Sequence, residues 1–185
     1  MRRFSAALLT LLAVPASANA YGRAQVGDAV AFATPTNAAI FDGQVESPFH
    51  CVAFSPQGDQ ALAGNAKGYV SQWDLKTGKQ TALFAGNKGA VLAVVYLPDG
   101  KSFVSCDSGS LTRVDIATGK VTQALQGHNG DVSSVAVSAD GARLVSGGAD
   151  KTVRVWDLKT GKELRRHNEH TKPVTRVSFA GKGQI

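Results

Sequence analysis

The sequence predicts an all-β fold in which one sheet motif recurs along the chain. The first observation behind this prediction is the stretch from Gly127 to Lys162, where short β-like runs alternate with turn signals. The second is that equivalent residues are found at a spacing of 41 or 42 residues. The third is that the first run of each copy keeps its apolar positions. Together these features are typical of antiparallel hairpins arranged as structural repeats.

Each element of the best-preserved copy has its own signal. The first run ends at Asp140-Gly141, residue types that tolerate the positive φ of a hairpin turn. A second run, Arg143 to Ser146, leads to a third, Thr152 to Trp156, whose residues alternate between two sides of a strand. Thr160-Gly161-Lys162 then turns the chain again. Four polar or amphipathic side chains stand where a strand core would ordinarily be apolar: His128, Ser146, Asp150 and Trp156.

The copies keep a common register. They are marked by the pairs Trp73-Asp74, Val114-Asp115 and Trp156-Asp157, by the turns Thr77-Gly78-Lys79, Thr118-Gly119-Lys120 and Thr160-Gly161-Lys162, and by the turns Gln57-Gly58, Asp99-Gly100 and Asp140-Gly141. Three columns of the first run stay apolar: Phe49, Val91, Val132 and Val174; Val52, Val94, Val135 and Val177; and Phe54, Tyr96, Val137 and Phe179. Several independent columns in register make chance a poor explanation.

At Gly127-His128, Ser146-Gly147, Asp150 and Trp156-Asp157 the sequence resembles the WD-repeat β-propeller family. The period agrees with the ~40–45 residues of a four-stranded blade. The resemblance implies a tetrad in which the Trp156 indole, the Ser146 hydroxyl, the His128 ring and the Asp150 carboxylate satisfy one another. Such groups are expected to occur as a set, because a buried donor without a partner costs ~1–3 kcal/mol.

The two earlier copies carry incomplete versions of this tetrad. The first has Trp73 with Gln44 or a neighbour, and the second has Asn87 and Val114. Because a half-satisfied buried network is worse than an apolar one, we expect loss of one member to be accompanied by loss of the others. The tetrad is therefore interpreted as structural.

The resemblance implies a ring of blades that this sequence does not complete. Blades are expected at about 43–85, 86–126 and 127–169, with a partial fourth at 170–185 that contains one strand, Val174 to Phe179. Propellers close with ~4–8 blades, so the sequence is interpreted as the N-terminal part of a longer propeller. The alternative is a ring completed by a second copy or by a separate polypeptide. Residues 21–42 form a lead-in whose Ala38 to Asp42 is a candidate ring-closing strand.

The first 20 residues differ in composition from the remainder of the chain. Arg2-Arg3 is followed by an uncharged apolar stretch, Ala6 to Val14, and by the small-x-small pattern Ala18-Asn19-Ala20. This pattern predicts a secretory signal peptide cleaved between Ala20 and Tyr21. The apolar stretch is too short for the ~20 helical residues of a membrane span, and no membrane span is expected after signal removal. The predicted location is periplasmic, of the bacterial type, or secreted.

The charge of the chain argues against a nucleic-acid partner. Without Arg2 and Arg3, 18 of the 20 basic residues remain against 14 acidic residues, which gives a modest net charge of +4. The basic residues are scattered and lack interleaved aromatic side chains, so nucleic acid is not expected as a partner.

Other candidate sites have simpler explanations. Cys51 and Cys106 are interpreted as two small buried thiols, although an oxidising compartment would permit a disulfide. His167 and His170, with His50 and Cys51, could suggest a metal, but they fall in separate parts of the repeats, so no metal and no cofactor are predicted. Ser146, His128 and Asp150 have the residue types of a hydrolase triad. Trp156 already accounts for them, and no enzyme is predicted.

The function predicted from the sequence is a non-catalytic protein-interaction scaffold. A propeller presents loops around a central channel, and loops held by a rigid sheet bind proteins or peptides. The candidate partner-binding rim comprises Lys88, Asn129, Asp131, Ala149, Thr171 and Lys172. The alternative is the propeller portion of a larger exported enzyme or c-type cytochrome whose active domain lies beyond residue 185.

Overall fold

The computed structural model describes residues 47–180, which contain eleven strands and no helix. The strands are β1 (Phe49–Phe54), β2 (Gln60–Asn65), β3 (Val70–Asp74), β4 (Gln80–Phe84), β5 (Ala93–Tyr96), β6 (Ser102–Cys106), β7 (Ser108–Asp115), β8 (Val121–Val137), β9 (Arg143–Gly148), β10 (Val153–Asp157) and β11 (Glu163–His167). The all-β prediction is confirmed. The expected signal peptide, its cleavage point at Ala20 and Tyr21, and the lead-in of residues 21–42 with its candidate strand all lie outside the described residues.

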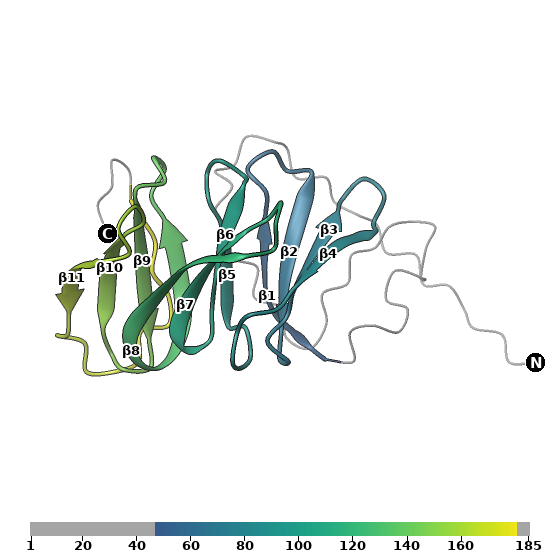
Figure 1. The fold of residues 1–185 in the computed structure, drawn as a ribbon. Helices are drawn as coiled ribbons and strands as arrows, with labels where there is room; N and C mark the ends of the chain where they lie inside the picture. The colour runs from purple at the N-terminus through teal and green to yellow at the C-terminus, as the bar shows by residue number, and fades with distance from the viewer. Residues whose placement is uncertain (1–46, 181–185) are drawn as a thin grey trace, which may run out of the picture.

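The strands form three antiparallel blades that lie side by side as an open arc (Figure 1). Blade 1 consists of β1 to β4 in order. Blade 2 consists of β5, β6, β7 and the first part of β8, whose Leu125 pairs with Leu111 of β7. Blade 3 consists of the second part of β8, where Val135 pairs with Ser146 of β9, followed by β9, β10 and β11. The described residues therefore form a propeller arc whose ring is not closed.

Blades 2 and 3 share β8 as one continuous strand of 17 residues. Asp107 alone separates β6 from β7, whereas four residues separate β2 from β3 and β9 from β10. This short connection lets β7 begin early, so that Ser108 pairs with Asp131 in the part of β8 that leads into blade 3. The sequence repeats did not predict this joint strand. The two blades therefore belong to one seven-stranded sheet.

The turn that follows each Trp-Asp or Val-Asp pair has one construction in all three blades. The aspartate carboxylate accepts hydrogen bonds from the backbone N–H and the hydroxyl of the threonine three residues later, at 2.6–2.9 Å. The glycine after each threonine has a φ of 66–74°, a conformation in which a side chain would be strained. The recurring Asp, Thr and Gly of the sequence thus make a recurring turn between the third and fourth strands.

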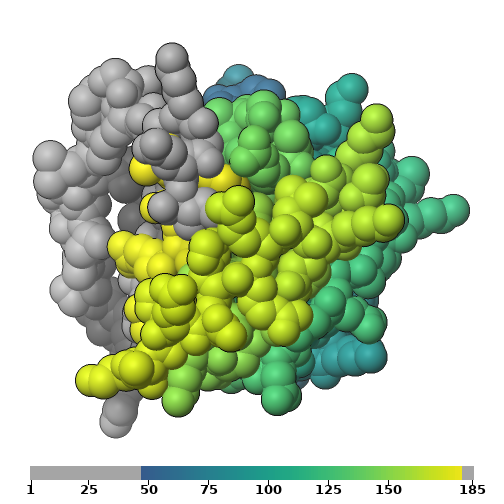
Figure 2. All heavy atoms as spheres, turned by 90° about the vertical axis from the view of Figure 1, so that its left-hand side faces the viewer, coloured from purple at the N-terminus to yellow at the C-terminus, as the bar shows by residue number. Residues whose placement is uncertain are grey.

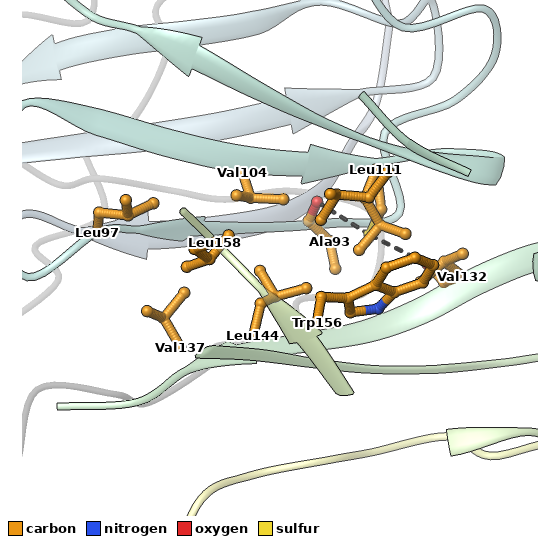
Figure 3. Close-up of a cluster of buried hydrophobic side chains, with 11 residues drawn as sticks. Ala93, Leu97, Val104, Leu111, Val132, Val137, Leu144, Trp156 and Leu158 are labelled. Atoms are coloured by element: carbon orange, nitrogen blue, oxygen red, sulfur yellow. Dashed lines mark hydrogen bonds between the residues drawn. The ribbon is translucent and has the colours of Figure 1, made fainter. Parts of the chain in front are cut away.

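Blade 2 is buried on both faces because it is packed between blades 1 and 3. Leu144 and Trp156 of blade 3 are 0% and 1% exposed and face Val104 and Leu111 of blade 2 (Figure 3). Between blades 1 and 2, the rings of Phe84 and Phe103 meet edge to face with centroids 5.1 Å apart. The core is therefore a series of interfaces between blades.

The prediction of a fourth-repeat strand from Val174 to Phe179 is wrong, because this segment lacks the hydrogen bonds of a strand. This segment packs against blade 3, where the Val174 N–H donates to Gly148 O at 3.0 Å and the Val177 N–H donates to Ser134 Oγ at 3.1 Å. It is not part of a strand ladder, since no second strand of its own repeat lies within residues 47–180 to pair with it. Its apolar residues still cover part of blade 3, with Val174 against Val145 and Val153.

Candidate functional site

The four predicted tetrad residues come together at one edge of blade 3. His128 lies on β8, Ser146 on β9, Asp150 in the β9–β10 turn and Trp156 on β10. Trp156 Nε1 donates to Ser146 Oγ at 2.8 Å, and Ser146 Oγ lies 2.8 Å from His128 Nε2. His128 Nδ1 lies 2.9 Å from Asp150 Oδ2. With the hydroxyl proton directed to Nε2, the His128 ring carries its own proton on Nδ1 and donates it to the carboxylate.

Three further residues extend the tetrad into a larger polar network that sequence reasoning missed. Arg154 is only 3% exposed and donates to Glu163 Oε2 at 2.8 Å and to Asp150 Oδ2 at 3.3 Å. Thr152 Oγ1 donates to Asp150 Oδ1 at 2.8 Å and accepts a hydrogen bond from Arg154 Nε at 3.2 Å. An arginine between two valines of a strand is ordinarily exposed, so no signal in the sequence indicated that Arg154 would be buried.

The network holds a neutral imidazole beside an ionised carboxylate. Burial by itself would raise the pKa of Asp150, but hydrogen bonds from the Asn129 N–H, from Thr152 and from His128 lower the pKa to about 2. Burial lowers the pKa of His128, and the hydrogen bond to Asp150 only partly opposes this effect. At neutral pH the charge of Asp150 is therefore balanced by Arg154, while His128 serves as an uncharged donor and acceptor.

This geometry is that of a structural network. Ser146 is 0% exposed, and its hydroxyl already accepts from the Trp156 indole. A nucleophilic serine needs access to substrate and an oxyanion site beside it. The Ser146 hydroxyl is buried and hydrogen-bonded to both Trp156 and His128, so the arrangement ties β8, β9 and β10 together.

Blade 2 keeps a shorter network of the same kind, contrary to the expectation that its members would be lost together. Ser105 Oγ donates to Asn87 Oδ1 at 3.0 Å, as Ser146 contacts His128 in blade 3. Asp107, which is 2% exposed, accepts from the Lys88 N–H at 2.7 Å. The amide of Asn87 replaces the imidazole because it can also accept from a serine.

In blade 1 the tryptophan indole N–H has a different hydrogen-bond acceptor. Ala63 stands where blade 3 has Ser146, so the Trp73 indole has no hydroxyl on the second strand. Trp73 Nε1 instead donates to Ser71 Oγ at 3.0 Å, from the position that Arg154 occupies in blade 3. The indole hydrogen bond is thus preserved while its acceptor moves to another strand. Gln44, the other expected member, is outside the described part of the chain.

The six candidate rim residues all have exposed side chains, and two of them are fixed through their backbone by the networks. The Asn129 N–H donates to Asp150 Oδ2 at 3.1 Å, as the Lys88 N–H does to Asp107. Asp131 accepts from Ser108 Oγ at 2.7 Å, and its carbonyl accepts from the Ala149 N–H at 2.8 Å. Thr171 and Lys172 lie in the segment after β11. Asp150 and Asp107 thus each fix the backbone of a rim residue whose side chain faces solvent.

The other candidate sites fall in ordinary surroundings. Cys51 and Cys106 are 2% and 0% exposed, and each thiol lies against backbone carbonyls, that of Cys106 within 3.2 Å of Val132 O. His50, His167 and His170 are exposed. Among residues 47–180 no group of three His, Cys, Asp or Glu side chains is arranged to hold a metal ion. Nor does that part of the chain contain a helix long and apolar enough to cross a bilayer.

A hollow of about 380 Å³ lies at the junction of blades 2 and 3. It is lined by Asp99, Lys101, Ser102, Arg113, Asp115, Thr122, Gln123, Leu158 and Lys159. Arg113 extends across the junction, with Nε and Nη2 donating to Ser102 Oγ and Nη1 donating to Leu158 O at 3.4 Å. The hollow contains basic and acidic groups side by side, and the arginine in it serves to join the two blades.

Comparison with known proteins identifies the repeats. Residues 36–74, 78–113 and 119–157 match the WD domain, G-beta repeat. The chain belongs to the WD40-repeat family. Among solved structures, this WD40-repeat chain is similar to a chain in the crystal structure of the mitotic checkpoint complex, with a TM-score of 0.70 at 23% sequence identity over 74% of this chain and 42% of the other. That likeness supports the propeller fold.

Several characterised proteins share parts of this WD40-repeat sequence. Protein tipD of Dictyostelium discoideum is 27% identical over 62% of this chain and 19% of its own length. Transducin-like enhancer protein 2 of Mus musculus is 33% identical over 61% of this chain and 15% of its own length. Transcription initiation factor TFIID subunit 5 of Caenorhabditis elegans is 31% identical over 31% of this chain and 9% of its own length. The chain thus spans less than a fifth of each of these relatives.

Proposed function

We propose that this WD40-repeat chain is an exported, non-catalytic scaffold that binds a protein or peptide through its rim. The rim residues are those expected from the sequence: Lys88, Asn129, Asp131, Ala149, Thr171 and Lys172. A rigid sheet that presents ordered loops suits recognition of another protein, because little conformational freedom is lost on binding.

The observation that supports this proposal is the way the buried carboxylates hold the rim. Asp150 and Asp107 accept hydrogen bonds from the backbone N–H groups of Asn129 and Lys88, so the main chain at two rim positions is fixed from inside the blades. The side chains of these residues are left exposed and available for a partner. The family relationship points the same way, since one relative is by its name a subunit of a transcription initiation factor.

Site-specific photo-crosslinking tests the rim. A photoreactive residue at Asn129 or Lys172 is expected to crosslink a partner protein in extracts of the exporting cell. The matched control is the same residue at Lys120, which is exposed but lies in the β7–β8 turn at the other end of the strands. Equal crosslinking from Lys120 and Asn129 would contradict a partner-binding rim.

Export rests on Arg2-Arg3, the apolar stretch that follows and Ala18-Asn19-Ala20. We expect the mature protein to begin at Tyr21 and to be found in the periplasm or the medium. N-terminal sequencing of protein recovered from a periplasmic fraction measures this directly. Protein that retains Met1 and stays with the cytosolic fraction would show that the leader is not a signal.

A further inference from the structure

The outer strand of blade 3 differs from the outer strands of the other two blades. β11 presents Arg165, Arg166 and His167 in succession, and all three side chains are exposed. We name these three residues the basic edge. The equivalent strands are Gln80–Phe84 of blade 1 and residues 121–126 of blade 2, and neither contains a charged side chain.

The comparison between blades excludes simple edge protection as the reason for this charge. Charged side chains on an edge strand can prevent unwanted strand pairing. The outer strands of blades 1 and 2 are also the fourth strands of their blades, however, and they have no charged residues. Protection of an outer edge therefore does not by itself require the basic residues that only β11 has.

The replacement at one position is especially informative. Phe84, Leu125 and His167 occupy equivalent positions, opposite Val70, Leu111 and Val153 on the neighbouring strand. Phe84 is 5% and Leu125 is 1% exposed, and each packs against the following blade. His167 is exposed and hydrophilic instead. The outer strand of blade 3 thus has a surface suited to a polar contact where the earlier blades have an apolar one.

The charge of the basic edge is only partly neutralised by the described residues, because Arg166 is paired with Glu163 whereas Arg165 is not paired. Glu163 is the acidic residue of β11, and its carboxylate already binds Arg154 at 2.8 Å and Arg166 at 2.9 Å. No carboxylate of residues 47–180 lies within 4.0 Å of the Arg165 guanidinium. Lys162 adds a further exposed positive charge just before the strand. The surface therefore complements a partner that carries several negative charges.

The backbone of β11 offers a second element of recognition. Within the described part of the chain β11 is the last strand of its sheet and pairs on one side only, with β10. Figure 2 views the molecule from this end, and the yellow-green atoms of the third repeat form the front of the molecule. An extended peptide can pair with such an edge through its main chain while its side chains reach the neighbouring residues.

We infer that β11 is a docking strand for an extended acidic peptide segment of a partner protein. The segment adds to the sheet beside β11, and its carboxylates pair with Arg165 and with the exposed part of Arg166. This surface shares no residue with the rim, so the inference has in common with the proposed function only the premise that the partner is a protein.

Arg165 and Arg166 are successive residues of β11 and point to opposite faces of the sheet. The test therefore uses the full chain and a synthetic eight-residue peptide that contains pairs of adjacent glutamates, so that carboxylates face both sides of the added strand. Titration is expected to show binding that weakens by about fivefold when Arg165→Gln is introduced, as loss of one or two exposed ion pairs predicts. Lys120→Gln removes an exposed lysine from another blade and is expected to leave the affinity unchanged. A circular dichroism melt of each variant verifies that it is folded, which the exposure of both side chains favours.

Two altered peptides separate charge from strand pairing. Replacement of every glutamate by glutamine is expected to abolish binding, and N-methylation of alternate backbone amides is expected to weaken it about tenfold because ladder hydrogen bonds are lost. Binding of the glutamine peptide with equal affinity, or indifference to N-methylation, would overturn the inference. Asn129→Ala at the rim is expected to leave peptide affinity unchanged, so failure of the rim proposal and failure of this one give different results.

Discussion

At the scale of single residues, blade 3 is stabilised by a chain of hydrogen bonds in which every polar group has an assigned partner. The Trp156 indole donates to Ser146, Ser146 contacts His128, and His128 contacts Asp150. Asp150 is the member with the most connections, since it also receives hydrogen bonds from Asn129, Thr152 and Arg154. The cost of removing a member should therefore be largest at this carboxylate.

Asp150→Ala is expected to lower the free energy of unfolding by ~1–3 kcal/mol, because buried donors on His128 and Arg154 lose their acceptor. Urea unfolding or a thermal melt of the full-length protein measures the change. Glu169→Ala is the matched control, since it removes an exposed carboxylate from the segment after β11 and should have little effect. Equal stability of the Asp150 variant and the wild type would show that the network does not stabilise the folded protein.

The neutral state of His128 predicts how stability depends on pH. Because the pKa of His128 is below its ordinary value of 6.5 in the folded protein, the unfolded chain takes up a proton first as the pH falls. The free energy of unfolding should therefore be highest above pH 6.5 and decrease below it, and the ionised form of Asp150 is lost only as the pH approaches about 2.

His128→Asn places in blade 3 the residue that blade 2 has at Asn87. The slope of unfolding free energy against pH between 7.5 and about 5.5 should be smaller in this variant than in the wild type, because one titrating group has been removed. Urea unfolding at several pH values measures both slopes. Parallel slopes for the two proteins would mean that His128 has the same pKa in the folded and unfolded states, and would contradict a neutral, buried imidazole.

The four tetrad residues could be predicted from the sequence because they match the positions at which the resemblance to the WD-repeat family implies a tetrad. Arg154 and Glu163 could not, since a charged residue in a strand is usually exposed and only the packing of two blades shows that this arginine is 3% exposed. The network of Asn87, Ser105 and Asp107 was missed for another reason. The connection before β7 is shorter than its equivalents, which moves the aspartate out of the register that the repeat defines.

At the scale of strands, adjacent blades fit because one cross-strand pair contains a cysteine and a smaller residue in two of the blades, with the cysteine on opposite strands. Cys51 pairs with Gly64 in blade 1, whereas Ala93 pairs with Cys106 in blade 2. The valine that begins the next repeat packs onto this pair, and a Cβ at Gly64 would lie 2.5 Å from Val91 Cγ1. Glycine at this position is therefore required for the close approach of blade 2.

Gly64→Ala is expected to destabilise the protein by ~1–3 kcal/mol, since the added methyl overlaps Val91 and Cys51 in a packed interface. Gly89→Ala is the control, because a Cβ there meets its nearest neighbour, Ser108 Oγ, at an ordinary 3.8 Å. Chemical denaturation of both variants gives the comparison. The same loss of stability in both would show that general glycine effects, and not the contact between blades, are responsible.

The strand pattern was more predictable than its connections. Turn residues and apolar columns located three blades, since alternation and glycine turns are local properties of the sequence. The continuity of β8 and the missing ladder at Val174 to Phe179 are not local properties. Whether a segment joins a strand ladder depends on whether another strand lies beside it, and the tertiary fold determines which strands are neighbours.

At the scale of the whole molecule, stability resides in the interfaces between blades. The cluster around Trp156 and Leu144 combines residues of blades 2 and 3, and a second cluster around Phe103 and Leu62 combines blades 1 and 2. A blade with both faces buried has little core of its own. A substitution that weakens one interface should therefore reduce the local stability of both blades that form it.

Leu144→Ala is expected to cost ~2–5 kcal/mol, because Leu144 is fully buried against blade 2. Amide hydrogen exchange should show reduced protection in β6 and β7 as well as in β9 and β10, with a smaller change in β2. Leu164→Ala, at a leucine that is 56% exposed, is the control and should change exchange little. Loss of protection confined to β9 and β10 would contradict a shared core.

The continuous β8 has a mechanical consequence. Blades 2 and 3 cannot tilt relative to one another without bending β8 and breaking the pair of Ser108 with Asp131. Blade 1 joins blade 2 through residues 85–92, which belong to no strand. Bending under load, and the first cut by a protease, should therefore occur between β4 and β5, and the seven strands beyond that point should move as a single stiff body.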